Sequence, residues 1–353
     1  MEDDLEILEK FETETENELE EIAELQNIEG SEDIDANEFG ETDETASEKI
    51  IEITAEENSE RLDTFLAEKL DFSRSRVANM IRNKLITNEA VRNNQERYLK
   101  PSRKVQTGDK FFVKIFASNN ENFLRAEPVD FEVVYEDSDI LVINKPSGVV
   151  VHPSPGNWRN TLVNGLVYRY PEMKKLMAWL RPGIVHRLDS GTSGLMVVAR
   201  TEGSTRELQR MFKDREIDKN YIALAHGRPK RPEGTISGPI DRDPDNFLKM
   251  AIIAGGKPSL TGYKVLWTRN NISMVKFKLY TGRTHQIRVH FSALGCPLVG
   301  DCTYGAPENE SELGRVYLHS WRLSFKHPVT GEQMNFKKNI TPDFLDYIHS
   351  SCS

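Results

Sequence analysis

The pattern of apolar and polar residues from about residue 59 onward predicts a mixture of helices and strands. Apolar residues recur at helical spacing in the segments 59–70, 160–170, 201–215 and 284–294. Alternating or continuous apolar runs typical of strands occupy 111–115, 131–135, 140–143, 149–151, 195–199, 220–225, 261–267 and 272–280. Because the helices are scattered among strands that follow one another directly, the pattern predicts an α+β fold with a mixed, largely antiparallel sheet.

A pair of short helices is predicted near the start of this patterned region. The first has one apolar face, formed by Leu62, Phe65, Leu66 and Leu70, and Ser73 is positioned to cap the second. The exposed face of the second helix carries a group of basic residues: Arg74, Arg76, Arg82 and Lys84. Such a face is either a surface that binds nucleic acid or simply a solvated helix face.

The net charge of the chain changes sign at about residue 48. The first 48 residues contain 21 Asp and Glu and one basic residue, Lys10, for a net charge of −20. The remaining 305 residues contain 45 Lys and Arg and 35 Asp and Glu, for a net charge of +10. The acidic segment has too little apolar surface to fold by itself, whereas a basic body beside an acidic tail is typical of nucleic-acid-binding proteins. We therefore expect a disordered acidic tail at 1–48, a small domain at 49–118 and a larger domain at 119–353.

The composition argues against several other classes of protein. The three cysteines, Cys296, Cys302 and Cys352, have neither metal-ligand spacing nor the density of a disulfide scaffold. His285 and His290 are five residues apart, which is off one helix face, so we expect no metal. Residues 255–257 lack the first glycine and the Ser or Thr of a phosphate-binding loop. Without an export signal or an apolar run of about 18 residues, the chain is expected to be soluble, cytoplasmic and free of membrane segments.

The run Gly183–Gly194 reads Gly-Ile-Val-His-Arg-Leu-Asp-Ser-Gly-Thr-Ser-Gly and carries the strongest chemical signal. It places Asp189 between an arginine and a turn, directly before the apolar run 195–199, which predicts a buried strand. The carboxylate is therefore expected on a loop at the edge of a core, where catalytic groups commonly lie.

This run resembles the active-site motif of the RluA-type family of RNA pseudouridine synthases. Further segments resemble other motifs of that family in the same order: 135–148 with 152–153, 219–224, 281–290, 300–301, 318–321, 327–328 and 330–332. The ordered set is far more specific than any one of its members. The resemblance implies the synthase fold and an isomerase that converts specific uridines of RNA to pseudouridine without a cofactor.

By the same resemblance, three residues carry the reaction. Asp189 is the catalytic carboxylate, and Arg288 is the cation that keeps it ionised, with a planar fork suited to a bidentate pair. Tyr221 stacks on the uracil and takes or passes the proton lost from the ring carbon. Asp189 attacks the anomeric carbon or the uracil ring, or stabilises positive charge on the sugar. The target base has to leave its stack, and Arg187 either fills the vacated space or holds the loop through an ion pair.

The small domain resembles the RNA-binding domain named after ribosomal protein S-four, although Asn83 and Glu89 stand where that family usually has glycines. By this resemblance Arg74, Arg76, Arg82 and Lys84 bind substrate RNA. The pairing of the two domains points to structured ribosomal RNA, foremost that of the large subunit, and to ribosome-assembly intermediates as partners. The alternatives are transfer RNA as substrate, a non-catalytic RNA-binding or ribosome-assembly protein with the same fold, and a nucleoside hydrolase.

Overall fold

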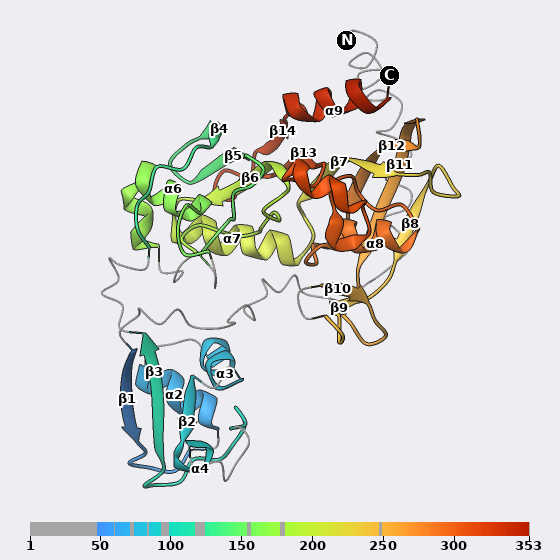
Figure 1. Cartoon of the computed structure of the whole chain (residues 1–353). Coiled ribbons are helices and arrows are strands. Elements are labelled where there is room, and N and C mark those ends of the chain that lie inside the picture. The colour runs from blue at the N-terminus through green and yellow to red at the C-terminus, as the bar shows by residue number, and fades with distance from the viewer. Residues whose placement is uncertain are drawn as a thin grey trace. The chain divides into compact units, whose positions relative to one another are not determined.

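The computed structural model describes residues 48–59, 61–70, 74–82, 85–92, 99–116, 124–153, 157–176, 181–246 and 249–352 (Figure 1). The acidic tail expected at 1–48 lies outside these residues except for Glu48. The described chain forms two compact units. One comprises the residues up to Ala126 together with His152–Arg159, and the other comprises Glu127–Val151 and the residues from Asn160 onward.

The smaller unit is a three-stranded antiparallel sheet, in the order β1, β3, β2, packed against short helices. Its elements are β1 (Glu48–Thr54), α2 (Leu62–Leu70), α3 (Arg74–Arg82), β2 (Ile86–Asn88), α4 (Glu89–Arg92) and β3 (Lys110–Phe116). The apolar face predicted for the first helix is confirmed, because Leu62, Phe65 and Leu66 are buried against Phe111 and Val113 of β3. The cap expected at Ser73 lies outside the described residues.

The larger unit is built on a mixed sheet that confirms the predicted α+β class. In the described part of the chain the strand order is β4, β5, β6, β13, β7, β12, β11, β8, with β14 on β13. The pair β6 and β13 is parallel and the other pairs are antiparallel. The strands are β4 (Glu132–Glu136), β5 (Ile140–Lys145), β6 (Ser193–Ala199), β7 (Asp218–His226), β8 (Glu233–Ser237), β11 (Leu260–Arg269), β12 (Ile272–Leu279), β13 (Leu318–Lys326) and β14 (Gln333–Lys337).

Helices cover both faces of this sheet (Figure 1). They are α6 (Leu162–Arg169), α7 (Glu202–Lys213), α8 (Gln286–Ala293) and α9 (Pro342–Cys352), and the short strands β9 (Ile240–Arg242) and β10 (Met250–Ile252) pair with each other. Leu208 and Phe212 of α7 pack with Leu195 and Val197 of β6. On the other face, Phe344 and Ile348 of α9 pack with Ile222 and Leu224 of β7. Burying apolar side chains on both faces makes β6, β7 and β13 the centre of the core.

The extended stretch expected at 149–151 does not form a strand. Its carbonyl groups are used by other elements instead. The carbonyls of Val150 and Val151 accept the backbone N–H groups of Leu162 and Val163, which open α6. The first N–H groups of a helix have no partner within the helix, so an extended segment beside its start can satisfy them in place of a neighbouring strand.

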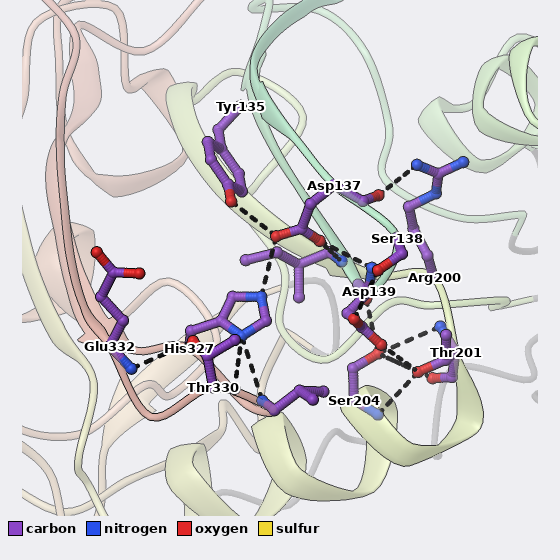
Figure 2. Close-up of polar contacts among 12 residues, drawn as sticks. Tyr135, Asp137, Ser138, Asp139, Arg200, Thr201, Ser204, His327, Thr330 and Glu332 are labelled. Atoms are coloured by element: carbon purple, nitrogen blue, oxygen red, sulfur yellow. Dashed lines mark hydrogen bonds and ion pairs between the residues drawn. The ribbon is translucent and has the colours of Figure 1, made fainter.

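A network centred on Asp137 ties the β4–β5 turn to the β13–β14 hairpin (Figure 2). Oδ1 of Asp137 accepts the backbone N–H groups of Asp139 and Ile140, both at 2.8 Å. Its Oδ2 accepts the hydroxyl of Tyr135 at 2.8 Å and lies 3.0 Å from Nε2 of His327. A carboxylate with this many donors is satisfied within the fold, which makes it a structural group.

The hydrogen bonds on the other side of the His327 ring fix its tautomer. Nδ1 accepts the backbone N–H groups of Val329 at 3.3 Å and Thr330 at 3.1 Å (Figure 2). The proton of the neutral ring therefore lies on Nε2, facing Asp137. The segments 135–148 and 327–332, which the sequence matched to family motifs, hold the edge of the sheet together through these contacts.

The same turn anchors the start of α7. Thr201 is the N-cap and forms a capping box with Ser204. The Ser204 hydroxyl donates to the carbonyl of Asp139 at 2.7 Å, and the Arg200 guanidinium donates to the carbonyl of Asp137 (Figure 2).

No helix in the part of the chain that the structure describes has the length and apolar character needed to cross a membrane.

Candidate active site

Asp189 lies on the loop predicted for it, immediately before the buried strand β6. The turn closes with a hydrogen bond from the Thr192 N–H to the Asp189 carbonyl at 3.1 Å. Two residues further on, Gly194 has a φ of 113°, and a Cβ there would lie 2.3 Å from the Ser320 carbonyl oxygen. Glycine therefore allows β6 to approach β13 closely, which fixes the end of the loop against the sheet.

A second loop, at 146–149, clamps the turn that follows Asp189. The Gly148 N–H donates to the Ser190 carbonyl at 2.9 Å, and the Ser147 hydroxyl donates to the Gly191 carbonyl at 2.9 Å. Lys145 is fully buried, and its Nζ donates to the carbonyls of Pro146, Val149 and Ser190 at 2.8 to 3.1 Å. Burial lowers the pKa of Lys145 to about 7. Sequence reasoning treated this segment as a motif without assigning a role to the lysine.

Arg288 joins two carboxylates from the first turn of α8. Its Nη1 donates to Oδ2 of Asp189 at 3.1 Å. Its Nε and Nη2 donate to the two carboxylate oxygens of Asp301 at 2.7 and 2.8 Å. The expectation of a cation beside Asp189 agrees with this geometry, but the bidentate pair forms with Asp301, not with Asp189. The Asp301 side chain is completely buried, so it takes the paired Nε and Nη2 donors, and Asp189 receives its bond from Nη1.

The surroundings of Asp189 favour its ionised form. Burial by itself raises the pKa of Asp189, but interactions with protonated His285, with Arg288 and with Arg187 outweigh this effect, and the pKa falls to about 2. Burial also lowers the pKa of His285, so this imidazole is neutral at pH 7 and gains its charge only in more acidic solution. The lasting cations beside the carboxylate are therefore Arg288 and Arg187.

His285, Tyr304 and Asp301 complete the site, and sequence reasoning did not assign them. His285 is the N-cap of α8 with φ of 55°, and its Nε2 lies 3.9 Å from Oδ2 of Asp189. Its Nδ1 lies 2.8 Å from the hydroxyl of Tyr304, whose ring lies under the Arg288 guanidinium at 4.9 Å. Asp301 and His285 fall inside segments that resembled family motifs, which was the only signal available for them.

Tyr221 lies in the middle of β7 and is buried. It is directly opposite Phe277 in β12, and Phe277 packs edge-on against Phe291 of α8. Since Ile222 belongs to the core on the α9 face, Tyr221 is on the face that α8 covers. The fold thus places Tyr221 and Arg288 on the same side of the sheet.

The other predicted site residues are Arg187, near Asp189, and the basic residues of the smaller unit. Arg187 is partly buried on the loop that carries Asp189, close enough to lower the pKa of that carboxyl group. Arg74 is exposed on α3, and its Nε lies 3.4 Å from a carboxylate oxygen of Asp63. The backbones of Arg76 and Arg82 belong to α3, but their side chains, like the whole of Lys84, lie outside the described part of the chain.

Two other histidines of the motifs are structural. Nε2 of His186 accepts the backbone N–H of Val197 at 3.1 Å, and burial lowers the pKa of His186 to about 3. His290 contacts the Thr261 hydroxyl at 2.9 Å and the Gly238 carbonyl at 3.1 Å. Among the described residues, no group of three or more His, Cys, Asp or Glu side chains could hold a metal ion.

The site is therefore built for carboxylate chemistry. An ionised aspartate on a clamped loop keeps 17% of its side chain exposed, while the arginine that holds it is itself held by a buried carboxylate. Such a group can act as a nucleophile or stabilise a developing positive charge.

Comparison with known proteins identifies the family. Residues 139–293 match the family described as RNA pseudouridylate synthase. The chain is 38% identical to the uncharacterized RNA pseudouridine synthase YlyB of Bacillus subtilis over 85% of this chain and 97% of that protein. It is 39% identical to the ribosomal large subunit pseudouridine synthase D of Neisseria meningitidis serogroup B, over 88% and 83% of the two chains. Among solved structures, human RNA pseudouridylate synthase domain containing 1 is 34% identical, with a TM-score of 0.50 over 60% of this chain and 84% of that chain.

The chain belongs to the RNA pseudouridine synthase family. It is an isomerase that converts uridine to pseudouridine in RNA.

Proposed function

We propose that this synthase isomerises specific uridines of large-subunit ribosomal RNA in the cytoplasm, acting on free ribosomal RNA or on ribosome-assembly intermediates. The observation that supports the chemistry is the set of contacts that joins Asp189, Arg288 and Asp301. Support for the substrate comes from the name of the Neisseria relative, with which this chain shares most of its length.

The reaction requires two changes at the nucleotide and no net change in composition. The bond between N1 of uracil and C1′ of ribose breaks, and a bond between C5 and C1′ forms. C5 loses a proton, and N1 gains one. Asp189 starts the exchange by attacking C1′ or the ring, or by stabilising the positive charge that develops on the sugar. Each of these roles needs the carboxylate ionised, which agrees with its depressed pKa.

Arg288 keeps Asp189 ionised and fixes the orientation of its carboxylate, and Asp301 holds Arg288 in place. Because Asp301 uses two donors of the fork, the guanidinium cannot rotate away from Asp189 without breaking both bonds. Tyr221 stacks on the flipped uracil and takes or passes the C5 proton. Arg187 occupies the space that the flipped base leaves in the RNA.

The small domain at 49–118, which is part of the smaller unit, acts as an RNA-binding domain through Arg74, Arg76, Arg82 and Lys84. Arg74 already contacts Asp63, which is buried and also accepts a bidentate contact from Arg61 at 2.8 and 2.9 Å. We therefore assign Arg74 a smaller share of phosphate binding than its exposure suggests, because its charge is partly neutralised.

The substrate is tested by mapping pseudouridines in ribosomal and transfer RNA from cells that lack the gene. Specific pseudouridines of large-subunit RNA should be missing, and they should return with the wild-type gene but not with Asp189→Asn. Loss of transfer RNA sites alone would assign the other substrate, and an unchanged map in both would contradict the proposed function.

The RNA-binding role is tested by replacing Arg76, Arg82 and Lys84 with alanine together in the full chain. RNA affinity should fall, and the slope of log affinity against log salt should become shallower by about 2 to 3, close to one for each phosphate that is no longer neutralised. The matched control is Arg206→Ala on α7, which removes a basic residue of the other unit. An unchanged salt slope in the triple variant would contradict the assignment.

A further inference from the structure

His285 offers the site a hydrogen-bond donor that the proposed mechanism does not use. Its Nδ1 is engaged by Tyr304 at 2.8 Å. Its Nε2 lies 3.9 Å from Oδ2 of Asp189, which is too long for a direct hydrogen bond. The side chain of His285 keeps 20% of its surface exposed, and that of Asp189 keeps 17%. Nε2 of His285 and Oδ2 of Asp189 are therefore separated by a gap of 3.9 Å, and each side chain is partly accessible to solvent.

The hydrogen bonds around Tyr304 determine which ring nitrogen of His285 carries the proton. The Tyr304 oxygen accepts the backbone N–H of Met250 at 2.8 Å, so its own proton is free to point elsewhere. Burial raises the pKa of Tyr304, so the hydroxyl keeps that proton. Among the described residues, Nδ1 of His285 at 2.8 Å is the acceptor placed beside this hydroxyl, so we assign Tyr304 as the donor of the bond. A neutral imidazole that accepts at Nδ1 carries its proton on Nε2. The Nε2–H group therefore faces the Asp189 carboxylate.

The gap has the dimensions of one bridging oxygen. An atom placed about 2.8 Å from both Nε2 and Oδ2 makes an angle of about 90° between the two, which a hydroxyl oxygen accommodates. This atom has to accept a hydrogen bond from His285 and donate one to Asp189. A hydroxyl group does both, whereas a carbonyl oxygen only accepts and an amide N–H only donates.

An internal uridine of RNA has one group that meets this requirement. Its 3′ and 5′ oxygens are phosphate esters without a proton, and its uracil ring carries carbonyls and one N–H. The 2′-hydroxyl both donates and accepts, and it is attached to the carbon next to C1′, where the bond breaks. We propose that His285 and Asp189 together bind the 2′-hydroxyl of the target uridine, so that the site recognises RNA at the reacting nucleotide. This inference rests on the proposed function, since it assumes that a uridine occupies the site.

The assignment makes His285 a substrate-binding residue and Tyr304 the group that orients it. The 2′-hydroxyl would also hold C1′ beside the carboxylate, so its loss should slow the reaction as well as weaken binding. A purely structural role for His285 would slow all substrates by the same factor.

The experiment compares two synthetic RNA hairpins that contain a uridine shown to be modified by the wild-type enzyme. One hairpin carries ribose at that position, and the other carries 2′-deoxyribose there. Single-turnover rates are measured with the wild type and with His285→Asn. Asparagine tolerates the left-handed backbone at this position and can still accept from Tyr304, but its side chain does not extend to the position of Nε2. His285→Gln returns a donor near that position.

With the wild type, 2′-deoxyribose should slow the reaction by about tenfold or more. With His285→Asn, the ribose substrate should slow by about tenfold, and the further penalty for 2′-deoxyribose should shrink to about threefold or less, with partial recovery in His285→Gln. If His285→Asn keeps the full penalty for 2′-deoxyribose, the inference is overturned. If His285→Asn is too slow to measure or does not fold, Tyr304→Phe supplies the same comparison. In that variant the imidazole of His285 remains, but its tautomer is no longer fixed by a hydroxyl at position 304. A wild type that modifies neither hairpin nor ribosomal RNA contradicts the proposed function itself.

Discussion

Two clusters of the larger unit contain the same three residue types, an aspartate, a histidine and a tyrosine. In the first, Oδ2 of Asp137 lies 3.0 Å from Nε2 of His327 and accepts a hydrogen bond from the Tyr135 hydroxyl at 2.8 Å (Figure 2). In the second, Oδ2 of Asp189 lies 3.9 Å from Nε2 of His285, and the hydroxyl of Tyr304 contacts the histidine and not the aspartate. The residue types alone do not separate a structural group from a chemical one.

The separation comes from how completely each carboxylate is satisfied. Asp137 accepts two backbone N–H groups and two side chains, which leaves its oxygens occupied. Among the described residues, the Asp189 carboxylate receives one hydrogen bond, from an arginine that a second carboxylate fixes in place, and its charge is balanced there by cations and not by backbone donors. A closed network stabilises the fold, whereas an open and charged one leaves capacity for a substrate.

The largest expected effect is at Asp189. Asp189→Asn keeps the shape of the side chain but removes its charge, so isomerisation should fall by at least about a thousandfold. The variant should remain folded and RNA affinity should change little, because Arg288 remains paired with Asp301. Turnover of RNA by the purified variant, together with its melting curve, checks this. Activity near that of the wild type would remove Asp189 from the chemistry.

Arg288→Lys should lower the rate by about a hundredfold. A lysine supplies the charge, but one ammonium group cannot hold Asp301 through two parallel bonds and also reach Asp189. Single-turnover rates on the same RNA give the comparison, and Arg322→Lys on β13 serves as the matched control. A loss of less than about threefold would mean that charge alone, and not the fork, is required.

Asp137→Asn should show the opposite behaviour to Asp189→Asn. Its amide cannot accept from all four donors, so the free energy of unfolding should fall by about 1 to 3 kcal/mol. The rate of the folded enzyme should stay within about twofold of the wild type. Urea unfolding and turnover at a temperature where both proteins are folded separate the two effects. A loss of rate without a loss of stability would make the two clusters alike.

The smallest expected effect is on the pH dependence of stability. The pKa of Asp189 is lowered from its ordinary value of 3.8 to about 2 in the folded protein, so folding favours its ionised form. The stabilisation is therefore fully present above about pH 4 and is lost as the pH falls toward 2. The difference in unfolding free energy between wild type and Asp189→Asn should be smaller at pH 3 than at pH 4. A difference that stays constant from pH 4 to pH 3 would contradict this assignment.

The sequence by itself determined the α+β class, most helices of the larger unit and the loop that carries Asp189. These features depend on local periods and turns, as in the apolar run that becomes β6. It did not predict β1, which begins at the last residue of the acidic segment and has charged residues at its start, or the helix α9. Both elements depend on packing: β1 pairs with β3 along its whole length, and α9 buries Phe344 against the sheet.

Only the tertiary structure decided which groups meet at the site. Asp189 and Arg288 are 99 residues apart and touch because β6, β13, β7 and β12 pair in a particular order. That order brings Asp301, and not Asp189, into the fork of Arg288, and it leaves Nε2 of His285 facing the carboxylate. The physical reason is that hydrophobic periodicity specifies which face of an element is buried, while the register between distant strands and the satisfaction of buried charges depend on the whole packed fold.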